Sequence, residues 1–269
     1  MAEPQLALTR LAGTAGQGDL LVVGPSLGTS VEAVWGAAAT RLADGFEVVG
    51  WDLPGHGRST PATEPFSIAE LAVAVRRLAG QLAGQLVGGR GRRASYAGVS
   101  LGGAVALELA LEPGVFGHVS CIASAARVGE PAMWHERAAL VRKAGTPVMV
   151  GPSSQRWFAD GFLDRDPATG NRLLLSLSDA DSESYALACE ALSGFDLRSR
   201  LADTQIPLLV APGEYDVVVP VHDAEQTAAA APGADLQVLA GCGHLPPAEA
   251  PAAVAAMLRA AHHMEESHD

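Results

Sequence analysis

The stretch Ser95-Tyr-Ala-Gly-Val-Ser-Leu-Gly-Gly103 contains the pattern G-x-S-x-G, with Ser100 at its centre. A short apolar run at residues 95–99 precedes the serine, and an alanine- and leucine-rich stretch at residues 101–111 follows it. This context predicts a buried strand, a sharp turn and a helix. Glycines two positions away on either side allow a strained turn, which projects the hydroxyl above the sheet at the positive end of the helix. The pattern therefore predicts that Ser100 is a nucleophile.

Apolar runs and helical stretches alternate outward from this motif in both directions. Ser67 followed by Glu70 forms a capping box, which marks the start of a helix. Strands that alternate with helices predict an α/β fold, with a mostly parallel sheet covered by helices on both faces. We expect strands at residues 20–24, 46–51, 95–99, 118–123, 206–211 and 236–239, and helices at residues 31–42, 67–86, 101–111 and 248–262.

The alternation breaks between residues 126 and 200. No strand pattern occurs there, but helical stretches carry Trp134, Trp157, Phe158 and Phe162. An insertion of that length predicts a helical lid rather than a loose loop. The chain then divides into a first core part at 1–125, the lid at 126–200 and a second core part at 201–269. We expect residues 262–269 to form a polar, frayed tail.

Composition excludes several classes of protein. The chain has 269 residues with a formal net charge of −12, which disfavours nucleic-acid binding. It lacks an apolar run of 18 residues and a basic, apolar N-terminal signal, so we expect no membrane partner and a cytoplasmic location. Cys121, Cys189 and Cys242 have no metal-type spacing and are expected to be buried thiols. The oligomeric state is not fixed by the sequence.

An acid and a base are expected further along the chain, in that order after a serine at such a turn. The stretch Pro212-Gly-Glu-Tyr-Asp216 directly follows a predicted strand, and Asp216 is the predicted acid, with Glu214 as the rival. The stretch Gly241-Cys-Gly-His244 follows the last predicted strand. Its glycines let the loop bring the His244 imidazole to the serine, where it acts as general base.

A tetrahedral intermediate also requires hydrogen-bond donors for its negative oxygen. We assign these to the backbone N–H groups of Leu101, which follows the nucleophile, and Leu27, in the loop after the strand at 20–24. The Ser26 side chain would either bind substrate or form the turn. His56, in Pro54-Gly-His-Gly57, is expected to hold its own loop through hydrogen bonds.

With these residues in place, the chain resembles the 3-oxoadipate enol-lactonases, α/β-hydrolases of the β-ketoadipate pathway of aromatic degradation. The resemblance spans essentially the whole chain, and its lid part is the more specific one. Its general parts are Ser26-Leu-Gly-Thr29, Asp52-Leu-Pro-Gly-His-Gly57, Ser100, Asp216 and His244. Its lid parts are Trp134-His-Glu-Arg137, Val141-Arg142, Gly145, Arg156-Trp-Phe158, Phe162, Tyr185, Cys189 and Gly194-Phe-Asp-Leu-Arg198.

The resemblance implies an α/β-hydrolase fold and a substrate that is a small enol-lactone bearing a carboxylate. Ser100 would form an acyl-enzyme and His244 would activate the water that releases 3-oxoadipate, with no cofactor and no metal. Pro25 and Pro54 depart from the pattern, because relatives often have asparagine and arginine at these positions. If that arginine helps to hold the carboxylate in relatives, another residue does so here.

The lid supplies the candidates for substrate binding. Arg137 and Arg156 are candidates for holding the substrate carboxylate, or they are surface and packing arginines. Trp134 and Trp157 either line the pocket or form the core of the lid. Two other functions use the same residues: a general carboxylesterase or perhydrolase, and a non-catalytic ligand-binding protein. A dehalogenase is disfavoured because its nucleophile would be an aspartate.

Overall fold

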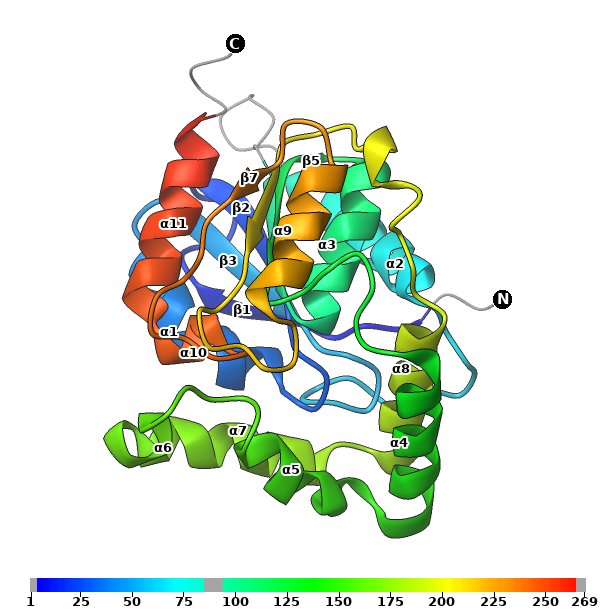
Figure 1. Ribbon diagram of the computed structural model, residues 1–269. Coiled ribbons are helices and arrows are strands. Elements are labelled where there is room, and N and C mark those ends of the chain that lie inside the picture. The colour runs from blue at the N-terminus through cyan, green and yellow to red at the C-terminus, as the bar shows by residue number, and fades with distance from the viewer. Residues whose placement is uncertain (1–3, 85–93, 265–269) are drawn as a thin grey trace.

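The computed structural model describes residues 4–84 and 94–264. Within these residues, a seven-stranded sheet with the order β1-β3-β2-β4-β5-β6-β7 forms the centre (Figure 1). All neighbouring strands run parallel except β1, which is antiparallel to β3. The α/β fold predicted from the sequence is confirmed. The strands are β1 (Leu8–Ala12), β2 (Asp19–Gly24), β3 (Phe46–Trp51), β4 (Ala94–Val99), β5 (Phe116–Ile122), β6 (Leu208–Ala211) and β7 (Asp235–Leu236).

The central strands are buried along almost their whole length, because helices cover both faces of a parallel sheet. This explains why their sequences are continuous apolar runs rather than alternating ones. The register places Gly24 of β2 beside Gly98 of β4. The loop that follows β2 therefore leaves the sheet next to Ser100, at the carboxyl edge where sites of such sheets form.

Helices occupy both faces of the sheet. α1 (Val31–Leu42) and α11 (Pro251–Met264) pack together on one face, and α2 (Ile68–Ala83), α3 (Leu101–Leu111) and α9 (Val221–Ala230) lie on the other (Figure 1). In the part of the chain that the structure describes, none of the helices is both long and apolar enough to cross a membrane.

The predicted capping box of α2 is present. The Glu70 carboxylate accepts the backbone N–H of Ser67 at 2.8 Å, and the Ser67 hydroxyl accepts the backbone N–H of Glu70 at 3.2 Å. These two bonds provide acceptors for N–H groups that have no partner within the helix at its first turn. The last residues of the helix predicted at 67–86 lie outside the described residues.

The helix and tail predicted at the C-terminus differ from the structure in two respects. The single helix expected at 248–262 is split into α10 (Pro246–Glu249) and α11, because Pro251 disfavours the helical conformation of Ala250. His262 is not in a frayed tail: it is 3% exposed, and its Nε2 lies 2.8 Å from Oδ2 of Asp19. It belongs to the interior, beside the edge-on ring of Phe46.

Residues 126–200, referred to below as the helical segment, connect β5 to the chain before β6. Figure 1 shows them as a separate layer next to the core. Its two ends are adjacent, because the Leu197 N–H donates to the carbonyl of Ala126 at 2.8 Å. Thr227 of α9 accepts the N–H of Ala126 at 2.9 Å. The helices are α4 (Pro131–Ala144), α5 (Val150–Ser154), α6 (Phe162–Arg165), α7 (Pro167–Asp179) and α8 (Ser182–Ser193).

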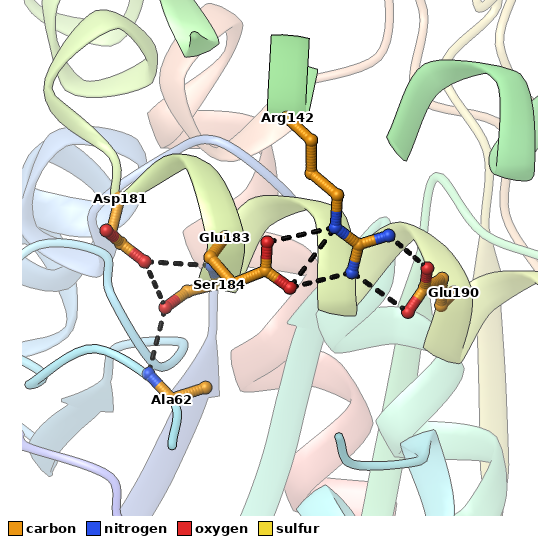
Figure 2. A network of polar contacts seen from close by, with 6 residues as sticks. All are labelled: Ala62, Arg142, Asp181, Glu183, Ser184 and Glu190. Atoms are coloured by element: carbon orange, nitrogen blue, oxygen red, sulfur yellow. Dashed lines mark hydrogen bonds and ion pairs between the residues drawn. The ribbon is translucent and has the colours of Figure 1, made fainter. Parts of the chain in front are cut away.

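A polar network connects α4 to α8 and α8 to the core (Figure 2). Arg142 of α4 forms ion pairs with Glu183 and Glu190, which lie about two helical turns apart on α8. The Ser184 hydroxyl donates to Asp181 at 2.6 Å and accepts the backbone N–H of Ala62 at 2.9 Å. The network therefore fixes the two helices to each other and fixes α8 to the loop that follows β3.

Candidate active site

Ser100 occupies a strained turn between β4 and α3. Its backbone has φ 57° and ψ −115°, a conformation that non-glycine residues rarely adopt and that is characteristic of functional sites. A Cβ on Gly98 would lie 1.9 Å from the carbonyl oxygen of Gly102, and a Cβ on Gly102 would lie 2.7 Å from the backbone of Gly24. Both positions require glycine, which explains the G-x-S-x-G pattern.

A chain of two hydrogen bonds joins the three residues predicted to act together. The Nε2 atom of His244 lies 2.8 Å from the Ser100 hydroxyl, and its Nδ1 atom lies 2.8 Å from Oδ2 of Asp216. All three side chains are buried. Their geometry suits proton transfer from the hydroxyl to the imidazole, with the carboxylate fixing the ring orientation.

The loop after β6 holds Asp216 in this position. Its Oδ1 accepts the backbone N–H groups of Val218 at 2.7 Å and Val219 at 3.0 Å, which leaves Oδ2 for His244. Glu214 lies in the same loop but is exposed, and its carboxylate accepts the N–H of Gly241 at 2.9 Å. The structure brings Asp216, and not Glu214, to the imidazole.

The loop after β2 forms a turn beside the serine. The N–H of Thr29 donates to the carbonyl of Ser26 at 3.1 Å, and the N–H of Gly102 donates to the carbonyl of Pro25 at 2.9 Å. Among the described residues, neither the N–H of Leu27 nor that of Leu101 has a hydrogen-bond acceptor. These are the two groups to which the sequence assigned the stabilisation of a negative oxygen.

Ser26 contributes to this turn through its backbone, which accepts both the N–H and the hydroxyl of Thr29. Its side chain is 2% exposed. Within the described structure the Ser26 hydroxyl makes no hydrogen bond to the protein. Turn formation by the backbone therefore leaves this hydroxyl available to another group.

His56 holds its own loop, in agreement with the sequence analysis. Its Nδ1 lies 2.9 Å from the carbonyl of Pro54, and its ring stacks on Tyr185 of α8 at 6.1 Å between centroids. Burial lowers the pKa of His56 to about 4, so the ring is neutral at pH 7 and donates from Nδ1. His56 thus links the loop after β3 to the helical segment.

Two arginines of the helical segment lie close to each other and to Tyr185. Burial and the charge of Arg137 lower the pKa of Arg156. Burial raises the pKa of the Tyr185 hydroxyl, and the charges of both arginines oppose this rise. Across residues 4–84 and 94–264, neither Arg137 nor Arg156 has a carboxylate within ion-pair distance. This half-buried positive charge is therefore open to an anion.

The two tryptophans of the helical segment are both buried. Trp134 donates its indole N–H to the carbonyl of Val128 and packs under Arg137, whose guanidinium lies 4.7 Å above the ring centre. The backbone carbonyl of Trp157 accepts the N–H of His244 at 2.9 Å. Trp134 thus supports an arginine, and Trp157 connects the helical segment to the histidine loop.

A carboxylate that the sequence analysis did not single out lies behind His244. Glu249 of α10 accepts N–H groups of the residues on both sides of the histidine. Its only sequence signal is a glutamate five positions after the histidine, and that spacing predicts no contact by itself. In the described part of the chain, no group of three or more histidine, cysteine, aspartate or glutamate side chains could hold a metal ion.

Comparison with known proteins places this geometry in a family. The chain matches the model described as "Alpha/beta hydrolase family" over residues 20–257. It is 34% identical to 3-oxoadipate enol-lactonase 2 of Acinetobacter baylyi over 79% of this chain and 78% of that protein, and 30% identical to 3-oxoadipate enol-lactonase 1 of the same organism over 76% and 74%. The crystal structure of the enol-lactonase from Burkholderia xenovorans LB400 superposes with a TM-score of 0.86 at 27% identity, with 95% of each chain covered. The resemblance to the enol-lactonases is thereby confirmed, and the chain belongs to the alpha/beta hydrolase family.

Proposed function

We propose that this hydrolase opens 3-oxoadipate enol-lactone, a small carboxylated enol-lactone, to 3-oxoadipate through an acyl-enzyme on Ser100. The observation that carries the proposal is the pair Arg137 and Arg156, which has no carboxylate partner in the described structure and lies in the segment joined to His244. The relatives named as 3-oxoadipate enol-lactonases support the same substrate.

In the first half of the reaction, His244 Nε2 takes the proton of the Ser100 hydroxyl as its oxygen attacks the lactone carbonyl. The ring C–O bond breaks, and the proton passes from His244 to the departing enol oxygen. The enol then becomes a ketone. In the second half, water gives a proton to His244 and attacks the acyl carbon. The bond from that carbon to the Ser100 oxygen then breaks, His244 returns the proton to the serine, and the free acid is released. No cofactor or metal enters these steps.

Negative charge on the carbonyl oxygen is stabilised by the N–H groups of Leu27 and Leu101. Their lack of other acceptors fits this role, because donors already bound to protein would have to break a bond first. The positive end of α3, a helix that starts at Leu101, adds to the stabilisation.

The substrate carboxylate is bound by Arg137 and Arg156, and the Tyr185 hydroxyl lies beside them. A guanidinium binds a carboxylate through two parallel hydrogen bonds, and partial burial strengthens that interaction. Trp134 supports the Arg137 side chain from below. Ser26 and Trp157 line the remaining wall, with the Ser26 hydroxyl free to bind a polar atom of the lactone.

Recognition of the substrate carboxylate must be local because the protein carries a formal net charge of −12, which repels an anion at long range.

We propose that residues 126–200 act as a lid over the core parts 1–125 and 201–269. Ser100 is 7% exposed, and the helical segment is joined to its partner His244 through the carbonyl of Trp157. Binding of the lactone therefore requires the segment to open, and closure around the substrate excludes bulk water.

Substrate preference tests the proposed function directly. The kcat/KM for 3-oxoadipate enol-lactone should exceed that for an uncharged lactone of equal size by about 30-fold or more, because one arginine–carboxylate contact contributes roughly 2 kcal/mol or more. The loss of the ultraviolet absorbance of the enol-lactone follows the reaction. Equal efficiencies, together with rapid turnover of aryl acetates, would instead indicate a general carboxylesterase.

Removal of either arginine charge should weaken the carboxylated substrate selectively. Arg137→Met and Arg156→Met should each raise KM for the enol-lactone by about 30- to 1000-fold, equivalent to roughly 2–4 kcal/mol, and change the hydrolysis of an uncharged ester far less. Arg142→Met is the matched control, since this arginine lies on the same helix as Arg137 but is paired with glutamates. Equal effects of a variant on both substrates would show that its arginine is structural.

A further inference from the structure

Glu249 supports the peptide groups on both sides of the histidine at the centre of the site. Its Oε1 atom accepts the N–H of Gly243 at 3.0 Å and the N–H of Leu245 at 3.1 Å. These two residues flank His244 directly. A single carboxylate, carried by the short helix α10, therefore sets the path of the backbone from which the imidazole projects.

The same carboxylate also reaches the helical segment. Its Oε2 atom accepts the N–H of Ala159 at 2.8 Å, and the N–H of His244 donates to the carbonyl of Trp157 at 2.9 Å. The two stretches pack so closely that a Cβ on Gly243 would lie 2.7 Å from the nitrogen of Ala159. Residues 157–159 and 243–245, far apart in the sequence, are thus connected through one side chain.

The carboxylate of Glu249 is half-buried among backbone N–H donors, and its pKa is raised on balance. Burial raises its pKa, while the N–H groups of Ala159, Gly243 and Leu245 and the nearby His244 oppose that rise. Two carboxylates therefore lie around His244. Asp216 contacts it directly, whereas Glu249 acts from behind the backbone.

We propose that Glu249 is a positioning residue that joins the histidine loop to the helical segment. This junction sets the distance from His244 to Ser100 and at the same time fixes Trp157, the neighbour of Arg156. The link to Arg156 rests on the proposed function, because there this arginine binds the substrate carboxylate. The placement of His244 does not depend on which ester or lactone is hydrolysed.

A fluorophosphonate probe tests the placement of His244 without any knowledge of the substrate. The Ser100 oxygen attacks phosphorus and displaces fluoride, and His244 takes the hydroxyl proton, so the labelling rate reports the serine–histidine pair. Glu249→Gln keeps the size of the side chain but removes one acceptor oxygen and the charge. We expect labelling at high pH to slow by about 10- to 100-fold. The slowing should lie in the maximal labelling rate and leave the half-saturating probe concentration nearly unchanged, because the serine–histidine pair acts on the chemical step.

Two further variants separate charge, position and loop stability. Glu249→Asp keeps the charge but is one methylene shorter, so its labelling rate should lie between those of Glu249→Gln and the original protein. Glu214→Gln is the matched control, since Glu214 accepts an N–H from the same loop at Gly241. It should label at the original rate. Original rates in folded Glu249→Gln, or equal slowing in Glu214→Gln, would overturn the proposal.

Hydrogen exchange on the unmodified protein provides a test that does not depend on whether a Glu249 variant folds. The amides of Ala159, Gly243 and Leu245 should exchange slowly and with similar protection, because one carboxylate holds all three. Protection of Ala159 that differs by more than about tenfold from that of Gly243 would show that the two stretches open separately. Unequal protection would contradict the junction, and similar protection would support it. Either outcome is independent of whether the enol-lactone is the substrate.

Discussion

Replacement of Ser100 by alanine should lower kcat by at least about 10³-fold while the protein stays folded. The only hydrogen bond of the hydroxyl in the described structure joins it to His244, so its removal leaves a single buried acceptor, Nε2 of that imidazole, without its partner. Alanine retains the Cβ and can adopt the same turn at φ 57°. Hydrolysis of an aryl acetate measures the rate, and circular dichroism checks the fold.

His244→Ala should cause a loss of similar size, because the serine is a weak nucleophile without its base. The double variant should be no worse than either single one, since the residues act as one unit. Near-normal turnover in a folded Ser100→Ala protein would place the nucleophile elsewhere. Additive losses in the double variant would show that the two side chains act independently.

Asp216→Asn should reduce kcat by about 10³- to 10⁴-fold. The side-chain oxygen of asparagine can still accept the N–H groups of Val218 and Val219, so the loop should keep its shape. The amide NH₂ group then faces Nδ1 of His244 and favours the imidazole tautomer that cannot take the serine proton. Circular dichroism should show an unchanged fold, and steady-state hydrolysis of an aryl acetate gives kcat.

Glu214→Gln serves as the comparison for this variant. Glu214 is exposed and contacts Gly241 rather than the imidazole, so kcat should stay within about threefold of the original value. A larger loss in Glu214→Gln than in Asp216→Asn would make Glu214 the acid. That ranking would also require the loop after β6 to change its conformation in solution.

The sequence was most informative where a functional residue directly follows a parallel strand. Ser100 follows β4, and Asp216 lies in the loop after β6. Carboxyl ends of parallel strands meet at one edge of the sheet, so order along the chain predicts proximity in space. The glycines around Ser100 added a second signal, because only a close backbone approach explains them.

Other features had no local signal. β1 pairs with a single neighbour, and its sequence Leu-Thr-Arg-Leu-Ala lacks the continuous apolar pattern of a central strand. His262 was expected in a polar tail, but it is buried against Asp19 and Phe46, residues more than 200 positions away. Glu249 acts through backbone N–H groups, one of which belongs to Ala159, 90 positions away. Contacts of this kind depend on tertiary packing and leave no periodicity in the sequence.

The adjacent ends of the helical segment have a consequence for how such proteins diversify. Since Leu197 is bonded to Ala126, an insertion between these points leaves the path of the sheet unchanged, whatever its length. The free energy of closing a loop grows only slowly with its length. Evolution and protein engineering can therefore replace the insertion while the strands of the sheet, and the residues that follow them, keep their positions. The replacement has one condition: the new insertion must again offer a carbonyl to His244 and an amide to Glu249.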